Sequence, residues 1–125
     1  MILKTAELRD TLKELFEALL NKKAYYLEAP QGAEYPYIVF EPSRLTSEYG
    51  VEKYDLEINA WDSYATASRI DALMDTLESG IDKYKHYDKS RTFVIHKGNR
   101  QYVSDEDKKI KRVRENFELT VVERR

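Results

Sequence analysis

The sequence predicts an α+β fold, namely an antiparallel sheet of about four to five strands with two helices packed on one face. Two patterns in the middle of the chain carry this prediction. Apolar residues alternate from Tyr54 to Ala60, as a half-buried strand requires, and then recur at spacings of three and four from Ala67 to Ile81, as one face of a helix requires. With the flanking segments, the expected order is α-β-β-β-α-β-β-β in a single domain that spans residues 1–125.

The first half of the chain is expected to hold one helix and three strands. The helix spans about Thr5 to Asn21, because leucines and one phenylalanine form a single apolar stripe along it. Pro36 opens a strand, where its missing N–H does least harm, and the polar residues around Gly50 favour a loop or hairpin tip at 43–52. The helical stripe consists of Leu8, Leu12, Leu15, Phe16, Leu19 and Leu20, and the strands are expected at 24–27, 37–41 and 53–62.

The second half begins with a helix at about 64–79, which Ser63 can cap and Gly80 can end. Residues 82–90 are polar and aperiodic, so an exposed connection is expected there. Gly98-Asn99 is a pair typical of a tight turn and would separate two strands. These two strands are expected at 92–97 and 100–103, and a last strand at 113–123.

The face of the predicted sheet that lies away from the helices is polar. Along the longest predicted strands, polar side chains alternate with the apolar ones and therefore share this second face. We expect this face to be wet or to contact a partner. Its residues are Asp55, Glu57, Asn59, Glu118 and Thr120.

Composition excludes some classes of protein and leaves the function open. The 21 basic and 23 acidic residues give a net charge of −2, which offers no global basis for binding nucleic acid or a membrane. Apolar runs such as 37–40 are far too short to span a bilayer, and the lack of cysteine removes disulfides and thiolate chemistry. Ten tyrosines stand against four phenylalanines and one tryptophan; half-buried strands favour tyrosine, as do protein interfaces, and both explanations stay open.

No group of residues suggests a catalytic or metal site. No pattern brings His86 or His96 to a serine with an orienting acid. A calcium loop that starts at Asp105 would require Gly at 110 and Glu at 116, where the chain has Ile110 and Asn116. The four glycines are isolated, so no phosphate-binding loop is present. We therefore predict no catalytic residue, no metal, no cofactor and no enzyme activity.

One basic cluster precedes the last strand. It consists of Lys108, Lys109, Lys111, Arg112 and Arg114. Two interpretations stay open: the cluster is a solvated strand end, or it contacts phosphate or an acidic partner. The acidic residues at 105–107 lie directly upstream, and the aromatic residues of a single-strand stacking platform are missing from the cluster.

Two strand motifs resemble those of the small tail terminator, or tail completion, proteins of long-tailed bacteriophages. The first is Pro36-Tyr-Ile-Val-Phe40, which follows the turn at 29–33. The second is Leu56-Glu-Ile-Asn-Ala-Trp61, which leads into an alanine-containing helix. The resemblance covers about residues 5–123, including the helix that opens the chain and the arginine-rich strand that closes it.

The resemblance implies a structural role in the virion tail, for a protein made in the bacterial cytoplasm. Members of this family form a ring, typically a hexamer, at the end of the tail tube and join it to the head connector. DNA passes through the lumen of that ring without sequence-specific binding. The family implies no enzyme activity, no cofactor and no membrane partner.

If the chain forms such a ring, its subunit contacts should use exposed aromatic side chains. An open sheet also has edges that invite pairing, and a closed ring of head-to-tail contacts would cover them. For Trp61 the alternative is that it packs on the start of the second helix. The competing hypothesis for the whole protein is a non-enzymatic α+β binding module for a small ligand or nucleic acid. The interface candidates are Trp61, Tyr64, Tyr49 and Tyr35.

Overall fold

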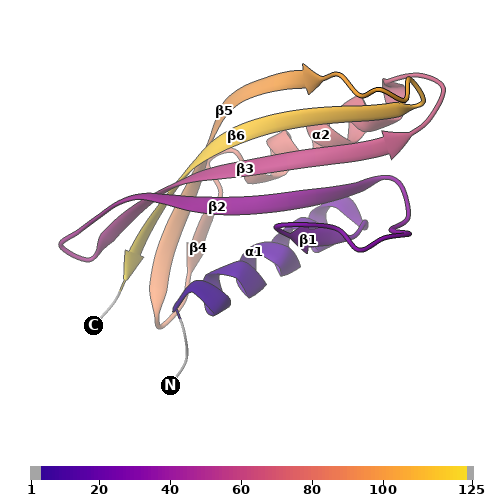
Figure 1. The fold of residues 1–125 in the computed structure, drawn as a ribbon. Coiled ribbons are helices and arrows are strands. Elements are labelled where there is room, and N and C mark those ends of the chain that lie inside the picture. The colour runs from indigo at the N-terminus through magenta and orange to yellow at the C-terminus, as the bar shows by residue number, and fades with distance from the viewer. Residues whose placement is uncertain (1–3, 124–125) are drawn as a thin grey trace.

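The computed structural model describes residues 4–123, which form two helices and six strands (Figure 1). The helices are α1 (Lys4–Leu20) and α2 (Ser68–Ile81). The strands are β1 (Ala24–Tyr26), β2 (Tyr37–Glu48), β3 (Val51–Ser63), β4 (Lys85–Tyr87), β5 (Arg91–Val103) and β6 (Ile110–Glu123). Neither helix in the described part of the chain is long and apolar enough to cross a membrane.

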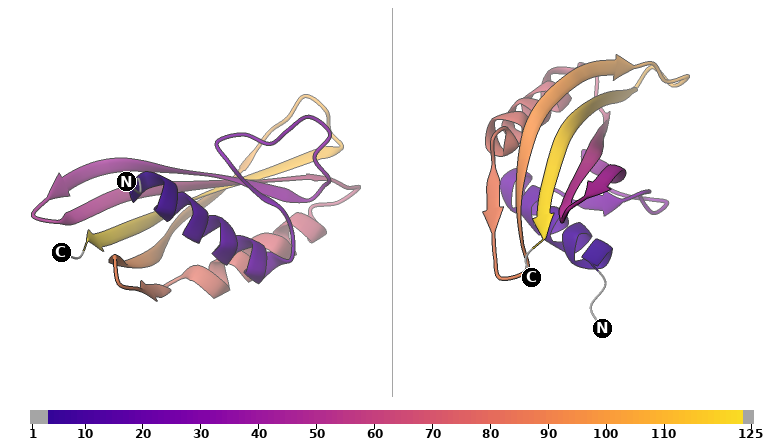
Figure 2. Two further views of the ribbon diagram at one scale, coloured as in Figure 1. Left: turned by 90° about the horizontal axis from the view of Figure 1, so that it is seen from below. Right: turned by 90° about the vertical axis from the view of Figure 1, so that its left-hand side faces the viewer.

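All six strands belong to one sheet, in the order β1-β2-β3-β6-β5-β4. β1 runs parallel to β2, and every other neighbouring pair is antiparallel. The sheet is twisted and curled rather than flat (Figure 2). The predicted antiparallel sheet of about four to five strands is therefore wrong: the sheet is mixed and has six strands.

Two three-residue edge strands account for much of this error. β4 lies inside the segment 82–90, which was expected to be an exposed connection. Three residues are too few to show the period of two that predicts a strand. In the structure, two backbone hydrogen bonds, from Lys83 N to Ile95 O and from Ile95 N to Tyr84 O, extend the pairing of this segment with β5. The parallel direction of β1 also could not be predicted from the sequence. The loop at 27–36 returns the chain to the end where β1 started, so that β2 can run parallel to β1.

The predicted tight turn at Gly98-Asn99 is also wrong. Lys97 pairs with Phe117 and Arg100 pairs with Glu115, so both sides of this dipeptide lie on the same neighbour, β6. The dipeptide is an irregularity within one long strand, β5, and not a reversal of the chain. A Cβ atom at position 98 would collide with the backbone carbonyl oxygen of Asn116, which explains the glycine.

The hairpin between β2 and β3 extends well beyond the core. A two-residue turn, Tyr49-Gly50, joins the strands, and the φ angles of 52° and 79° are those of a type I′ turn. The expected hairpin tip is thus found, but its flanks are strand rather than loop. Residues 43–50 are exposed, so they show no apolar alternation from which a strand could be predicted.

The second helix starts later than predicted, at Ser68 and not near residue 64. β3 continues through Ser63, which pairs with Ile110 of β6 and therefore cannot cap the helix. Ala67 occupies the N-cap position without a side-chain hydrogen bond, and Gly80 lies inside the helix, close to Leu19 of α1. The close approach of the two helices, rather than helix termination, explains this glycine.

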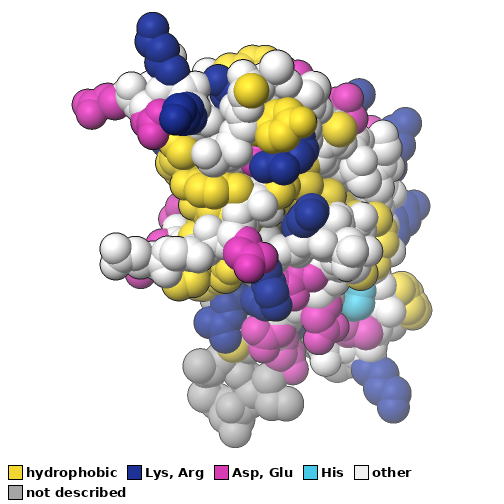
Figure 3. Space-filling model, turned by 90° about the vertical axis from the view of Figure 1, so that its right-hand side faces the viewer, with side chains coloured by type: hydrophobic (Ala, Val, Ile, Leu, Met, Phe, Trp, Pro, Cys, Tyr) yellow, Lys and Arg dark blue, Asp and Glu magenta, His cyan; other side chains and the backbone are white. Residues whose placement is uncertain are grey.

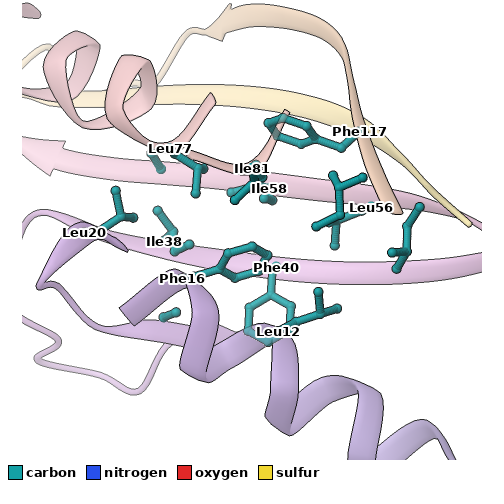
Figure 4. Packing of buried hydrophobic residues seen from close by; sticks show 14 of the residues in the cluster. Leu12, Phe16, Leu20, Ile38, Phe40, Leu56, Ile58, Leu77, Ile81 and Phe117 are labelled. Atoms are coloured by element: carbon teal, nitrogen blue, oxygen red, sulfur yellow. The ribbon is translucent and has the colours of Figure 1, made fainter. Parts of the chain in front are cut away.

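One apolar core joins both helices to one face of the sheet, which we call the core face. Phe16 of α1 and Phe40 of β2 meet edge to face, with ring centroids 5.2 Å apart (Figure 4). Leu15 and Leu19 are only partly buried against this core. The buried residues of α2 are Ile70, Leu73, Met74, Leu77 and Ile81, and those of the longest strands include Ile38, Leu56, Ile58, Phe93, Phe117 and Leu119.

Candidate interaction surface

The opposite face of the sheet, which we call the outer face, carries most of the candidate residues. Along β3, Tyr54, Leu56, Ile58 and Ala60 are buried in the core, so the side chains between them project from the outer face. The same alternation places alternate residues of β2 and β6 there. The outer-face residues near the middle of the sheet are Tyr37, Val39, Glu41, Asp55, Glu57, Asn59, Trp61, Arg112, Arg114 and Asn116.

Trp61 and Arg112 face each other across β3 and β6. Their Cα atoms are direct partners in the sheet, and the Arg112 guanidinium lies 4.5 Å from the centroid of the Trp61 ring. Arg112 also donates from Nε and Nη2 to Asn59 Oδ1, at 3.2 and 3.0 Å. Trp61 therefore packs on an arginine of the outer face and not on the start of α2.

Three tyrosines continue this surface toward the β1 edge. Tyr37 is the sheet partner of Trp61. Its ring meets that of Tyr25 edge to face, with centroids 5.7 Å apart, and stacks with that of Tyr35, with centroids 5.5 Å apart. Partial burial raises the pKa of Tyr37, with smaller contributions from the two neighbouring tyrosines. We call Tyr25, Tyr35, Tyr37 and Trp61 the aromatic strip. The structure thus brings together two of the four predicted interface residues, Trp61 and Tyr35.

A hollow of about 370 Å³ lies beside the aromatic strip. Its apolar wall includes Leu27 and Val39, and three carboxylates, Glu28, Glu41 and Glu57, line it together with Arg112. Asn59, Tyr37, Trp61 and Ala29 complete the lining. At the end of the molecule drawn at the right of Figure 1, hydrophobic side chains gather with basic ones among them (Figure 3).

The other two predicted interface residues lie apart from the strip. Tyr49 is at the tip of the β2–β3 hairpin and is 99 % exposed. Tyr64 follows β3, and the guanidinium of Arg69 lies 4.5 Å from its ring centroid. Arg69 also donates to the carboxylate of Asp62, which is fully buried, so Tyr64 packs on the exposed arginine of this ion pair at the start of α2.

The structure divides the predicted basic cluster. Arg112 and Arg114 belong to the outer face, where Arg114 lies 3.5 Å from Glu57, whereas Lys108 and Lys109 are exposed in the turn between β5 and β6. Lys111 Nζ donates to the backbone oxygen of Lys108 at 2.6 Å. The cluster is thus divided between the outer face and the turn, and its contact with phosphate or an acidic partner stays a prediction.

The acidic turn and the histidines have local structural roles. The carboxylates of Asp105 and Asp107 accept backbone N–H groups of the same turn, both at 2.9 Å. His86 stacks on Phe93 and contacts Asp88, and this contact is the main cause that lowers the pKa of Asp88 to about 2. Among residues 4–123, no group of three or more His, Cys, Asp or Glu side chains could hold a metal ion.

Sequence reasoning missed a charge cluster around the buried Glu115 on the core face. Arg100 of β5 donates to Asp75, Glu78 and Glu115, at 2.8, 2.9 and 2.9 Å. Burial, together with the neighbouring carboxyl of Glu78, raises the pKa of Glu115 to about 7. The signal was present in the sequence, because Glu115 occupies the inward phase of β6 between Val113 and Phe117.

Comparison with known proteins identifies the fold and not a family. No family model and no curated protein sequence matches the chain. Twenty-five chains of solved structures match. One belongs to the structure described as "Virion of native gene transfer agent (GTA) particle", with 14 % sequence identity, a TM-score of 0.65, and coverage of 88 % of this chain and 85 % of that chain. This chain therefore has the fold of a chain found in a gene transfer agent virion.

Proposed function

We propose that the protein is a structural component of a phage or prophage virion, of the tail terminator or tail completion type. In this proposal, copies of the chain form a ring, a hexamer by analogy with that family, at the end of the tail tube and join it to the head connector. The fold shared with a chain of a gene transfer agent virion is the observation that carries the proposal. The two strand motifs at 36–40 and 56–61 support the more specific terminator role.

The chemistry of the outer face suits assembly better than turnover. The aromatic strip offers large, half-exposed rings whose burial against another protein would supply binding energy, and aromatic residues dominate the energetics of many interfaces. Arg112 is already positioned by Asn59 and Trp61, so little side-chain freedom would be lost on docking. The protein would thus act by contact, without catalysis or a cofactor.

The remaining partners follow from the same proposal. The tail-tube protein and the head connector proteins would bind the two rims of the ring, and DNA would pass through the lumen without sequence-specific contacts. Lys108 and Lys109, exposed on the turn after β5, would face an acidic partner or the passing phosphates. The protein would reside in the virion tail after synthesis in the bacterial cytoplasm.

Light scattering tests this proposal on the pure protein. Mass would be measured at low and high concentration, with and without the purified tail-tube protein from the same phage genome. We expect a mass that is a multiple of 14.8 kDa, either alone or once the tube is added. A chain that stays monomeric in every condition and also fails to bind the tube would overturn the proposal.

The hollow beside the aromatic strip favours one second candidate, a binding module for a small ligand or nucleic acid. Its volume of about 370 Å³ lies within the range of small-molecule pockets, and it combines apolar walls with convergent polar groups. A monomer whose Trp61 fluorescence changes on addition of a ligand would favour this candidate. For nucleic acid, affinity should fall steeply with salt.

A further inference from the structure

The outer edge of β2 is covered along only part of its length. β1 pairs with residues 38–40, and hydrogen bonds from Ile38 N to Lys23 O and from Leu27 N to Phe40 O mark the backbone groups that face outward. Pro42 comes next on this side and has no N–H to offer, which shields the edge next to β1. Beyond it, residues 43–48 run beside β3, with a register shift at Leu45, and have no strand on their outer side within the described chain.

The edge of the sheet formed by β5 has the same construction. β4 pairs with residues 92–94 of β5, and Lys97 N donates to Asp82 Oδ1 at 3.0 Å. The outer edge of β5 is therefore covered only as far as Lys97. The following residues, 98–103, lie next to β6 on one side, with the irregularity at 98–99, and next to no strand on the other among residues 4–123. The side chains of Arg100 and Tyr102 contact α2, so it is the backbone edge of this segment that is open. Each long strand is therefore half covered by a three-residue strand and half open.

The two open segments lie at opposite edges and opposite ends of the sheet. β2 is next to one edge and β5 next to the other, and the hairpin tip and the last residues of β5 point to opposite ends of the molecule (Figure 1). Open edges of this kind pair readily with another chain. Because the two segments are different surfaces of equal length, pairing one with the other is a head-to-tail contact, which closes into a ring when the rotation permits.

We propose that copies of this chain associate by strand addition, in which residues 43–48 of one copy pair with residues 98–103 of the next. The proposal rests on the proposed ring and names the surfaces that close it. Large apolar side chains accompany both segments and are exposed in the single chain: Leu45 by 66 %, Tyr49 by 99 % and Tyr102 by 64 %. Strand addition would bury part of this surface and pair the open backbone groups at the same time.

The charges near both segments suit either strand direction. An antiparallel addition brings Glu41 of one copy toward the turn that carries Lys108 and Lys109 of the next, and a parallel addition brings Glu48 toward that turn. Within residues 4–123, no ion pair engages Glu41 or Glu48, whereas Arg44 in the same strand is already paired with Glu52. The acidic residues of one surface thus remain available for the lysines of the other.

Engineered disulfides test the contact directly, because the chain contains no cysteine. Gln101 is exposed and lies opposite the exposed Thr46 if the segments pair in parallel, and opposite the exposed Leu45 if they pair antiparallel. The double variant is therefore T46C/Q101C for parallel addition and L45C/Q101C for antiparallel addition, and it brings the new thiols close in each case. The protein would be assembled with the tail-tube protein if needed, oxidised, and analysed by denaturing electrophoresis without reductant. We expect a ladder of covalent multiples in one of the double variants and no covalent dimer in any single variant.

Three results would overturn the proposal, and they differ in what they say about the ring. If light scattering shows a ring but neither T46C/Q101C nor L45C/Q101C gives a ladder, strand addition is wrong and the proposed function stands. If T46C alone gives a covalent dimer, the β2 edges pair with each other instead. If no assembly forms at all, the proposed function falls as well. The variant T76C/Q101C, whose first cysteine lies on the exposed side of α2, is the control for random oxidation.

Discussion

Arg100 and Glu115 form an ion pair across β5 and β6, with 2.9 Å between Arg100 Nε and Glu115 Oε1. Glu115 is completely buried, and the same guanidinium binds Asp75 and Glu78 of α2. Lys97 Nζ lies 3.6 Å from Glu78 Oε1, so three carboxylates face two cations. One negative charge remains in excess, which a proton on the Glu78–Glu115 pair can relieve. This cluster fastens the C-terminal half of α2 to the sheet just after the irregularity at 98–99.

The cluster predicts a pH dependence of stability. In the folded protein the pKa of Glu115 is raised to about 7, above the ordinary value of 4.5 for a glutamate, so the folded state holds the proton more tightly than the unfolded state. The contribution is present at low pH and is lost as pH rises through 7, by roughly 1–3 kcal/mol in the free energy of unfolding. Urea unfolding between pH 5 and 8 would measure this slope.

The variant Glu115→Gln should flatten that slope, because the amide keeps the shape of the side chain and cannot titrate. Glu118→Gln is the matched control, since Glu118 is exposed on the same strand. A slope that persists unchanged in Glu115→Gln would show that another group is responsible.

The irregularity in β5 predicts unequal costs for two glycine substitutions. Gly98→Ala should lower the free energy of unfolding by roughly 2 kcal/mol or more, because the new methyl group meets the rigid carbonyl of Asn116. Gly32→Ala has open space around it and should cost only about 1 kcal/mol, from its positive φ of 85°. Chemical denaturation of both variants would compare them. Equal costs would mean that β6 moves aside for the new methyl group, so that the close approach does not explain Gly98.

Two leucines on the helices should differ in their contribution to the core. Leu73 of α2 is only 8 % exposed, so Leu73→Ala should cost roughly 2–4 kcal/mol. Leu15 of α1 is partly buried at the margin of the core, and Leu15→Ala should cost less, about 1–2 kcal/mol. Denaturant midpoints at constant slope would test the order. A larger loss for Leu15→Ala would mean that the faces of the helices are assigned incorrectly.

The aromatic strip predicts which substitutions weaken association. Trp61→Ala removes the aromatic side chain on which Arg112 packs and should weaken association through the outer face at least tenfold, because a large aromatic side chain in an interface contributes more than charges at its margin. Tyr35→Ala, which removes another exposed ring of the strip, should act in the same direction. Lys83→Ala and Lys85→Ala, at exposed positions outside the strip, are the controls. Light scattering at graded concentrations would rank the four, and equal effects would remove the strip from the interface.

The sequence predicted those parts of the fold that a regular period encodes. The stripe from Leu8 to Leu20 and the alternation from Tyr54 to Ala60 became α1 and the buried part of β3. Segments without a period could not be predicted. β4 has only three residues, and residues 43–48 of β2 are exposed on both faces of the sheet. Gly98-Asn99 suits a turn and an irregular strand equally well, and only the pairing of its neighbours with β6 distinguishes the two.

Prediction of the surface was less complete, for a related reason. Trp61 and Tyr35 were predicted as interface residues from their type, but their proximity depends on the β2–β3 register, which places Tyr37 opposite Trp61. The members of the basic cluster are close in sequence, but β6 starts between them. Some therefore lie in the turn before β6, and others project from the faces of the strand. Contacts between strands decide which side chains meet, and a single sequence does not state that register.

The order of the strands has a consequence for synthesis of the protein. β6 is the last described strand along the chain, yet it lies between β3 and β5 and pairs with both along most of its length. On the ribosome, α1 and the β2–β3 hairpin emerge long before it, and until it arrives β3 has a bare edge and β5 lacks its main neighbour. The sheet can therefore close only after residues 110–123 have left the exit tunnel, and a nascent chain that stops before Ile110 would be vulnerable to aggregation.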